Sequence, residues 1–529
     1  MRRIEITPGG EFRLTFPYDP NLVKAIREHF EYPNYQPQEK VWLIPPTPGN
    51  INQVWEYRIR YGFDLIGELD TPAALMQRFR AGRIAASMAT DAPDLHIPGL
   101  GGRLRPFQRA GVAYMVRTRR CLVADEMGLG KTVEALAALA YASAFPALVV
   151  VPSMLLLYWQ AQIRHWLPDR PMQVLRSGQR KEIGRGLYLV SYATLRNYIK
   201  GQPDFFGKTV KLHGLVCDEA HYLKEYRTQR TKAVKQVARW VPHRFLLTGT
   251  PVLNRPDELV SLLYLLGILY PLGGARRFHQ RVREAGPQGL EKVHEELRVW
   301  GFLRRKRAQV LPELPEKEVV QVPVALAEPQ KYRNLEWNFL AEARQAGRPA
   351  NLLSRLTALR QEAVRQKMPA VIAWLEAFLE SGEKVVVFGH HRAALEQLGE
   401  RFNAPVLYGG LTAKRQQEIA QRFQEDAAMQ LLVAGLTVGG TGWTWTAARH
   451  AVFIELDWTP ARHDQAEDRL LRIGQRRRVT VWYLLAMESI DADIWKLHKR
   501  KRERVEALTD GDLDLLAILA AMQARRETA

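Results

Sequence analysis

The sequence predicts an α/β fold with two tandem parallel-sheet lobes, a helical insertion between them and a small α+β domain at the N-terminus. Two sets of short, uninterrupted apolar runs, each bounded by turn residues, carry this prediction. Such runs are typical of strands that are buried on both faces. Amphipathic helical patterns lie between the runs, and strands that alternate with helices form parallel sheets with right-handed crossovers.

Each set contains five expected strands. The first lies at 121–124, 147–152, 187–192, 214–219 and 244–250, and the second at 384–390, 405–410, 430–436, 451–457 and 479–486. Between the sets the pattern is helical and charged, whereas residues 1–85 begin with two alternating stretches and a helix. The expected domains are therefore 1–85, 86–265 (first lobe), 266–365 (helical insertion and linker), 366–500 (second lobe) and 501–529 (C-terminal helical tail).

The charge of the chain favours a polyanionic partner. Its 529 residues include 76 Lys and Arg against 56 Asp and Glu, a formal net charge of +20. This excess indicates nucleic acid first and an acidic membrane surface second. The two cysteines, Cys121 and Cys217, lie in apolar runs, which argues against a disulfide framework or a metal site.

Targeting and membrane signals are missing from the sequence. The first residues lack an apolar core of signal-peptide length, and the most hydrophobic stretch, 259–272, is too short to span a bilayer. We therefore expect a cytoplasmic protein (nucleoid-associated if prokaryotic) that acts as a monomer and away from membranes.

The segment VADEMGLGKT predicts a phosphate-binding loop. The usual pattern places a glycine five residues before Gly130, where this chain has Asp125. The segment nevertheless leads from an expected strand into an expected helix, whose free N–H groups and dipole favour an anion. Gly128, Leu129 and Gly130 would surround the phosphates of ATP, Lys131 would reach the β- and γ-phosphates, and Thr132 would offer its hydroxyl to Mg²⁺.

A pair of acidic residues follows another expected strand. Asp218 and Glu219 end the run at 214–219, so in a parallel sheet they lie at the same edge as the loop. Asp218 would hold Mg²⁺, and Glu219 would polarise the attacking water. Together with LTGTP at 247–251, these motifs predict a nucleotide hydrolase.

Two arginines in the second lobe complete the expected catalytic set. Arg469 and Arg472 lie three residues apart in QAEDRLLRIGQ, and we expect them to share one face of a helix. An arginine supplied to the transferred phosphoryl group stabilises its charge.

In their order along the chain, these motifs resemble helicase superfamily two, and within it the Swi/Snf-type double-stranded DNA translocases. The likeness covers about residues 100–500 and includes LRPFQRAGVAYM, DEMGLGKT, DEAH, LTGTP and FLRRKRAQVLPELPEK. It implies two RecA-like lobes. In this superfamily the first glycine of the loop is often absent.

Further roles follow from the resemblance alone. It implies that Gln108 contacts adenine, that Thr248 and Thr250 couple the lobes, and that the DNA contacts include Ser191, Thr194 and Thr437. Basic clusters at 304–307, 476–478 and 499–504 could also hold DNA phosphates, with Arg304, Arg305, Arg476 and Arg477 as candidates. Trp443 and Trp445 are expected to pack in a core.

A finer likeness concerns the N-terminal region. FRLTFPYDPNLVKAIREHF, EKVWLIP and the ELDWTP segment together resemble the annealing-helicase branch, whose members carry a HARP domain ahead of the motor. This implies remodelling or reannealing of forked DNA in replication and repair, with single-strand-binding or replication proteins as further partners. A structural cap on the first lobe is the alternative for residues 1–85.

The expected function is a DNA-dependent ATPase that moves along double-stranded DNA. Two alternatives remain open. One is an ATPase that remodels a nucleic-acid-bound protein such as RNA polymerase, as RapA-type relatives do. The other is an RNA-directed DEAH helicase, which the RIGQ and ELDWTP segments disfavour.

Overall fold

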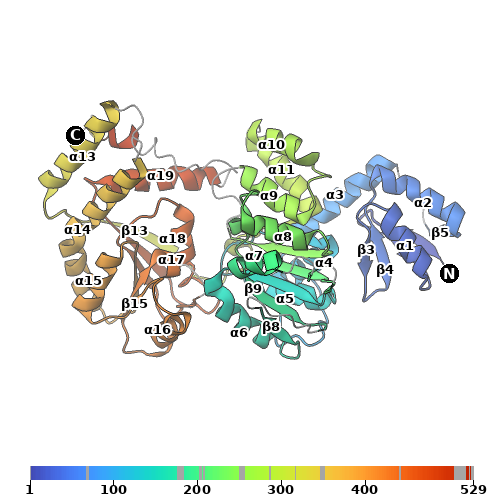
Figure 1. Cartoon of the computed structure of the whole chain (residues 1–529), viewed down its shortest axis with the longest axis horizontal. Helices are drawn as coiled ribbons and strands as arrows, with labels where there is room; N and C mark the ends of the chain where they lie inside the picture. Colours follow the sequence, from blue (N-terminus) through green and yellow to red (C-terminus); the bar gives the residue numbers. More distant parts are fainter. Residues whose placement is uncertain are drawn as a thin grey trace. The chain divides into compact units, whose positions relative to one another are not determined.

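The computed structural model describes residues 2–66, 71–175, 184–201, 205–206, 209–249, 256–284, 287–315, 317–345, 352–439, 443–505, 520–523 and 525. Backbone proximity divides the chain into two compact units, many of whose elements are labelled in Figure 1. The first unit comprises Met1–Glu126, Gly130–Pro251 and Pro256–Val310. The second comprises Met127–Leu129, Val252–Arg255 and Leu311–Ala529.

The N-terminal part of the first unit is a small α+β structure, as expected. Its five-stranded sheet has the order β3-β4-β2-β1-β5, antiparallel except for the β1–β5 pair. The strands are β1 (Arg3–Ile6), β2 (Phe12–Thr15), β3 (Asn34–Gln36), β4 (Val41–Ile44) and β5 (Asp64–Ile66), and the helices are α1 (Pro20–His29), α2 (Pro48–Tyr61) and α3 (Pro72–Met88). Each helix begins with proline after Asp19, Thr47 or Thr71, whose side chain accepts a bond from a first-turn amide.

A buried ion pair joins this part to the rest of the first unit. Glu11, only 1% exposed, accepts hydrogen bonds from Arg83 of α3 and from Arg117 of α4 (Pro106–Thr118). Burial raises the pKa of Glu11, but the two guanidinium groups outweigh it and hold the pKa below its ordinary value. Asn34 adds a bond to the carbonyl of Arg117 at 2.7 Å. The N-terminal sheet is thus tied to the first lobe by buried polar contacts.

The first lobe is built on a seven-stranded sheet with the order β12-β6-β11-β10-β7-β9-β8, and every pairing is parallel. Its strands are β6 (Arg120–Val123), β7 (Ala147–Val151), β8 (Met172–Val174), β9 (Leu187–Ser191), β10 (Gly214–Cys217), β11 (His243–Leu247) and β12 (Phe302–Leu303). The helices after α4 are α5 (Lys131–Tyr141), α6 (Leu156–Trp166), α7 (Tyr192–Gly201), α8 (Gln229–Ala238), α9 (Pro256–Leu266), α10 (Gly274–Glu284), α11 (Pro287–Trp300) and α12 (Arg307–Val310), with short 3₁₀ turns at Ser153–Leu155 and Ala220–Leu223.

The second unit contains a six-stranded, fully parallel sheet with the order β13-β18-β17-β14-β16-β15. Its strands are β13 (Lys317–Pro323), β14 (Val385–Gly389), β15 (Val406–Leu407), β16 (Leu431–Gly435), β17 (His450–Phe453) and β18 (Val479–Leu485). Its helices are α13 (Pro329–Gln345), α14 (Leu352–Leu379), α15 (Arg392–Phe402), α16 (Ala413–Glu425), α17 (Leu436–Gly439), α18 (Pro460–Glu467) and α19 (Ile490–Val505). Two parallel α/β lobes in tandem are confirmed.

The region expected to be a helical insertion also contributes to both sheets. β12 pairs with β6 in the first unit, and β13 pairs with β18 over seven residues in the second. The segment expected as a helical insertion and linker thus also carries two strands. β12 is too short to give a strand pattern, and β13 is an edge strand whose residues alternate in exposure instead of forming an apolar run. The expected C-terminal tail lies largely outside the described residues.

Candidate functional site

The loop between β6 and α5 has the backbone that a phosphate site requires. Gly128 and Gly130 adopt φ values of +83° and +86°, in the left-handed region that favours glycine. A Cβ atom at Gly130 would lie 2.5 Å from Nε2 of Gln108, so a side chain at this position would clash. The loop is closely packed against Gln108, which is itself only 4% exposed.

Lys131 begins helix α5 and folds back over the loop. Its Nζ donates to the carbonyl oxygens of Asp125 at 2.7 Å and Glu126 at 3.1 Å. The ammonium group is therefore held beside the loop and the N-terminus of α5, where backbone amides and the helix dipole attract an anion. Thr132 follows on the first turn of the same helix.

Asp125, which stands where the usual loop has glycine, is the centre of a buried ion-pair network. Its two carboxylate oxygens accept from the backbone N–H of Arg305 at 2.7 Å and from its Nε at 3.0 Å. Arg305 also donates to Oε1 of Glu134 on α5 at 2.6 Å. None of the three side chains is more than 1% exposed. A Cβ at Gly111 would lie 2.5 Å from Glu134 Oε1, so the glycine in α4 makes room for the network.

This network has one guanidinium group for two carboxylates. Burial raises the pKa of Glu134, and Asp125 adds to the rise although Arg305 opposes it. The network ties the loop, α5 and the segment after β12 together. It also corrects the expectation that Arg305 meets DNA, because its buried guanidinium already binds two carboxylates. Arg304 is partly buried and donates to the carbonyl of Ala124 at 2.8 Å.

Asp218 lies directly after β10 and is held by three neighbours. Its carboxylate accepts from the indole N–H of Trp159 at 2.6 Å and from the amide of Glu219 at 2.9 Å. Its carbonyl accepts from the hydroxyl of Tyr192 at 2.7 Å. Burial raises the pKa of Asp218 to about 6, and the adjacent Glu219 carboxylate adds to the effect. A nearby cation would favour the ionised form.

Glu219 takes a strained backbone conformation beside Asp218. Its φ is +49°, in the left-handed region, and its carboxylate lies 3.1 Å from Nδ1 of His221. Such strain in a residue other than glycine clusters at functional sites.

The strand order brings these motifs to one edge of the sheet. β11 lies between β6 and β10, so the loop after Val123, Thr248 and Asp218 follow three adjacent parallel strands. Neighbouring strands are about 4.8 Å apart, which places the ends of β6 and β10 roughly 10 Å from one another. The hydroxyl of Thr132 and the buried carboxylate of Asp218 both offer oxygen atoms, which are the ligands that a hard cation such as Mg²⁺ prefers. Thr250 lies outside the described residues.

The hydroxyl of Ser191 already has a structural partner. It accepts from the amide of Thr194 at 3.1 Å and donates to Oγ1 of Thr194 at 2.9 Å, so it caps the first turn of α7. Ser191 is 3% exposed and Thr194 is half-buried. In the second unit, Thr437 is exposed on α17. DNA contact by these residues stays a prediction.

In the second unit, Arg469 and Arg472 point toward the same backbone group. Both guanidinium groups donate to the carbonyl of Trp443, at 3.4 and 3.3 Å, and Arg472 also donates to Oγ1 of Thr444 at 3.0 Å. The expectation that a helix carries them is wrong, because α18 ends at Glu467 and turns follow it. The turns nevertheless bring the two side chains together.

Gln475 organises the basic segment that follows. Its side-chain amide donates to the carbonyls of Thr446, Ala448 and Leu470, and its oxygen accepts from the amides of Arg476 and Arg477. Both arginine side chains are exposed.

Of the remaining sequence candidates, Trp445 is fully buried and Trp443 packs against the same core, as expected. In the third basic cluster Lys499 is exposed, and the side chains of 500–504 lie outside the described residues.

Sequence reasoning missed several residues that support the site. The amphipathic pattern around Trp159 does not indicate that its indole N–H binds a carboxylate. Glu134 lies in the first turn of a helix, where an acidic residue is common, so its pairing with Arg305 was not predicted. The partnership of Asp125 with Arg305 joins residues 180 positions apart. Only the unusual Asp125 gave a signal, because a carboxylate in a phosphate loop needs a cation.

Two kinds of feature are absent from the described residues. Helices with the length and apolarity to cross a bilayer were not found among them. Nor did the same part of the chain bring three or more His, Cys, Asp or Glu residues into a cluster that could hold a metal ion.

The chain matches the models of two known protein domains. Residues 107–368 match the model of the SNF2-related domain, and residues 366–474 match that of the helicase conserved C-terminal domain.

The chain is similar to mouse DNA annealing helicase and endonuclease ZRANB3, with 30% identity over 440 residues, covering 77% of this chain and 41% of that protein. It is also similar to the SWI/SNF-related matrix-associated actin-dependent regulator of chromatin subfamily A-like protein 1 of Xenopus tropicalis, with 30% identity over 427 residues, covering 76% and 44%. The chain thus spans less than half the length of these relatives.

Among solved structures, the Sulfolobus solfataricus SWI2/SNF2 ATPase core in complex with dsDNA aligns with a TM-score of 0.40 and 24% identity, over 82% of this chain and 97% of that chain. The chain belongs to the Swi/Snf-type family of helicase superfamily two, whose SNF2-related and helicase C-terminal domains it carries in sequence order.

Proposed function

We propose that the chain is a DNA-dependent ATPase that translocates on double-stranded DNA. The observation that carries the proposal is the convergence of Lys131, Thr132 and Asp218 on one sheet edge, within a chain that carries the SNF2-related domain. The loop amides and the N-terminus of α5 suit the phosphates of ATP. The positive net charge of the chain suits the phosphates of DNA.

The proposed roles follow from the positions of the side chains. Gln108 packs against the loop and would contact the adenine, while Lys131 would leave the loop carbonyls for the β- and γ-phosphates. When bound, Mg²⁺ would neutralise phosphate charge, and Thr132 and Asp218 are the residues that would hold it. Glu219 would orient the attacking water. We assign Arg469 and Arg472 the role of arginine fingers, because both guanidinium groups gather at one carbonyl.

A finer proposal concerns the DNA structure on which the motor acts. Relatives at about 30% identity include a protein named as a DNA annealing helicase, and the N-terminal α+β structure is where a HARP-like domain was expected. We propose that the chain remodels or reanneals forked DNA and that residues 1–85 direct it there. The buried Glu11 contacts favour a fixed position for this part on the first lobe.

An ATPase assay across a panel of nucleic acids tests the proposal. Purified chain is mixed with duplex DNA, forked DNA, single-stranded DNA and RNA of equal nucleotide content, and phosphate release is followed. We expect stimulation by duplex DNA, more by a fork, and a steep decline with KCl because several phosphates are neutralised. Stimulation by RNA alone would contradict the proposal.

A further inference from the structure

The amino ends of the strands in the first lobe carry a second concentration of positive charge. Arg120 begins β6, and in the parallel register it pairs with Arg244 of β11. The phosphate loop follows the opposite ends of these strands, after Val123. At about 3.3 Å per residue the two edges are roughly 10 Å apart, so this region is separate from the proposed nucleotide site.

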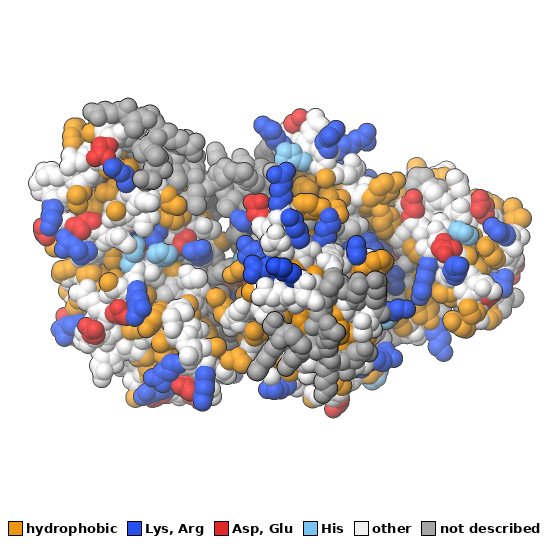
Figure 2. Space-filling view, in the orientation of Figure 1, with side chains coloured by type: hydrophobic (Ala, Val, Ile, Leu, Met, Phe, Trp, Pro, Cys, Tyr) orange, Lys and Arg blue, Asp and Glu red, His pale blue; other side chains and the backbone are white. Residues whose placement is uncertain are grey.

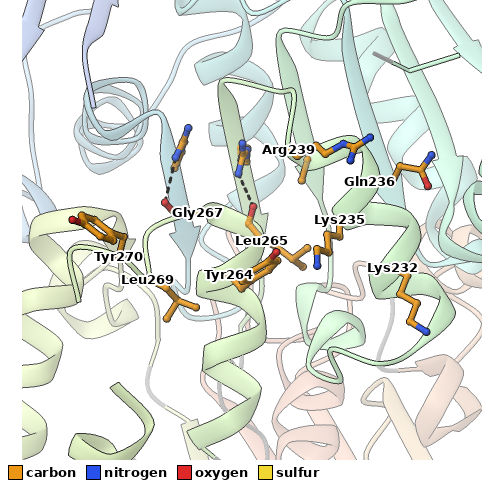
Figure 3. A pocket seen from close by; sticks show the side chains of 12 residues that line it. Lys232, Lys235, Gln236, Arg239, Tyr264, Leu265, Gly267, Leu269 and Tyr270 are labelled. Carbon is orange, nitrogen blue, oxygen red and sulfur yellow. Dashed lines mark hydrogen bonds between the residues drawn. The ribbon is translucent and has the colours of Figure 1, made fainter. Parts of the chain in front are cut away.

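The side chains here line a pocket of about 840 Å³. Five of the lining residues are basic: Arg120, Lys232, Lys235, Arg239 and Arg244. Among the described residues, the twelve that line it include no Asp or Glu. Figure 3 shows Lys232 and Lys235 on α8 and Arg239 directly after it, with Lys235 pointing toward Tyr264 of α9 and Tyr270 at the other side of the pocket.

Two guanidinium groups converge at the base of the pocket. Arg244, 7% exposed, donates to the carbonyls of Leu265 at 3.0 Å and Leu266 at 3.2 Å, and Arg120 donates to that of Gly267 at 3.2 Å. A Cβ at Gly267 would lie 3.0 Å from Nη1 of Arg120 and 3.1 Å from Nη1 of Arg244. Burial lowers the pKa of Arg244 to about 9, and the charge of Arg120 adds to the effect. Carbonyl dipoles at the end of α9 compensate the two charges only in part.

The rim combines further cations with aromatic rings. Lys232 on α8 and Arg239, which follows the last residue of α8, are exposed. The ammonium of Lys235 lies 4.6 Å from the ring centroid of Tyr264. Tyr264 is 40% exposed and Tyr270 is 78% exposed. Exposed aromatic rings beside a basic groove form the arrangement on which unpaired bases stack.

The basic surface continues beyond the pocket. Helix α10, which packs against α9, carries exposed Arg276, Arg277 and Arg283. Figure 2 shows Lys and Arg side chains gathered over α8, α9 and α10 on this face of the first unit. A strand that leaves the pocket would therefore meet more positive charge.

We propose that this pocket binds a single-stranded segment of nucleic acid, with its phosphates held by Arg120, Lys232, Arg239 and Arg244 and its bases stacked on Tyr264 and Tyr270. The volume lies in the range that encloses a small ligand or a few nucleotide units. A B-form duplex, whose major groove alone is about 12 Å wide, could cover the mouth without entering. The proposal rests on the proposed function and deepens it, because a forked substrate offers unpaired strands as well as duplex.

Fluorescence anisotropy with labelled dT20 and the full chain tests the proposal. Lys232→Ala/Arg239→Ala removes two exposed charges from the rim, and Lys414→Ala/Arg415→Ala on α16 removes the same charge from an exposed surface of the second unit. We expect the rim variant to bind dT20 at least about 10-fold more weakly than the control. Its slope of log K against log salt should be smaller by about 1.4, since each single-strand phosphate contributes roughly 0.7. Duplex-stimulated ATPase should be unchanged.

Tyr270→Ala isolates the stacking contribution. We expect it to weaken binding of dT20 several-fold and to leave binding of an abasic 20-mer unchanged, because only the former has bases to stack. Equal dT20 affinity in the rim variant and its control would overturn the proposal, as would an equal loss of duplex affinity. Binding of pyrophosphate that depends on the rim, without such dependence for dT20, would identify a small-anion site instead. Absence of duplex-stimulated ATPase in the unmodified chain would refute the proposed function alone, since the binding comparison does not use turnover.

Discussion

The two edges of the seven-stranded sheet in the first unit both concentrate charged side chains, but they balance that charge in different ways. At the carboxyl edge, Arg305 binds Asp125 and Glu134, and Lys131 binds loop carbonyls. At the amino edge, the bonds that Arg120 and Arg244 make within the described part of the chain go to backbone carbonyls, and the described residues that line their pocket include no carboxylate.

This difference indicates which kind of ligand each edge favours. Buried charges are stable when paired, and a buried group without an opposite charge favours a ligand that supplies one. At the carboxyl edge, buried Arg305 is already paired with carboxylates of the chain, and Lys131 is held close to the phosphate loop. This arrangement is suited to binding one nucleotide in a defined position. The amino edge gathers cations and aromatic rings, which suits an extended polyanion.

The largest expected effect is at the carboxyl edge. Lys131→Ala should abolish ATP turnover and leave nucleic-acid binding nearly intact, because this ammonium faces the phosphate loop and the basic surface lies elsewhere. Steady-state phosphate release and dT20 anisotropy measure the two properties, with Lys414→Ala as the control for loss of one exposed lysine. Turnover at the unmodified rate would remove Lys131 from the site.

The second largest effect concerns the two arginines that we propose as arginine fingers. Arg469→Ala or Arg472→Ala should lower kcat by about 10³-fold or more if the residue acts as an arginine finger. Single-turnover hydrolysis measures it directly, and Arg415→Ala is the matched control. If one variant retains full kcat, the other arginine alone carries the role; if both do, the assignment fails.

Breaking the internal pairing should destabilise the fold. Arg305→Met leaves two buried carboxylates without a cation, which should lower the free energy of unfolding by about 3–5 kcal/mol. Urea denaturation of the single variant is compared with Asp125→Asn/Glu134→Gln/Arg305→Met, which removes all three charges. We expect the triple variant to recover part of the loss; a single variant as stable as the unmodified chain would show that the pairing contributes little.

Protonation of His243, which begins strand β11 at the amino edge, should lower the stability of the fold. Burial, with Arg119 adding to it, lowers the pKa of His243 to about 3, so the folded chain holds this ring neutral while the unfolded chain protonates it below about 6.5. Its contribution to stability is complete above pH 6.5 and is lost as the pH falls toward 3. Between pH 7 and 5 the loss should be roughly 2 kcal/mol. Urea titrations at both pH values should show a smaller loss for His243→Gln than for the exposed control His96→Gln.

The smallest expected effect concerns Ser191, for which a structural role and a DNA-binding role can be distinguished. Ser191→Ala should cost about 1 kcal/mol of stability, because it removes the cap of α7. Ser191→Thr keeps the hydroxyl and serves as control. Thermal melting and duplex affinity are measured together; a loss of affinity without a loss of stability would favour direct DNA contact.

Much of the architecture was predictable from the sequence. Continuous apolar runs fix where strands form, because a strand buried on both faces has no polar positions, and all ten expected strands of the two lobes are present. The loop at 124–132 was predictable despite Asp125, since Gly128, Gly130 and Lys131 retain their spacing between strand and helix. Strands without an apolar run, β8, β12 and β13, were missed.

Partnerships between distant residues were decided only by the tertiary structure. The sequence contains Asp125, Glu134 and Arg305, but nothing in their local patterns indicates that one cation pairs with two carboxylates from different elements. Nor does it show that Arg469 and Arg472 meet through turns instead of a helix, or that Arg120, the first residue of β6, lines one pocket together with residues of α8 and α9. Local periodicity determines secondary structure because it depends on neighbouring residues, whereas charge pairing depends on strand order, which is set by packing of the whole sheet.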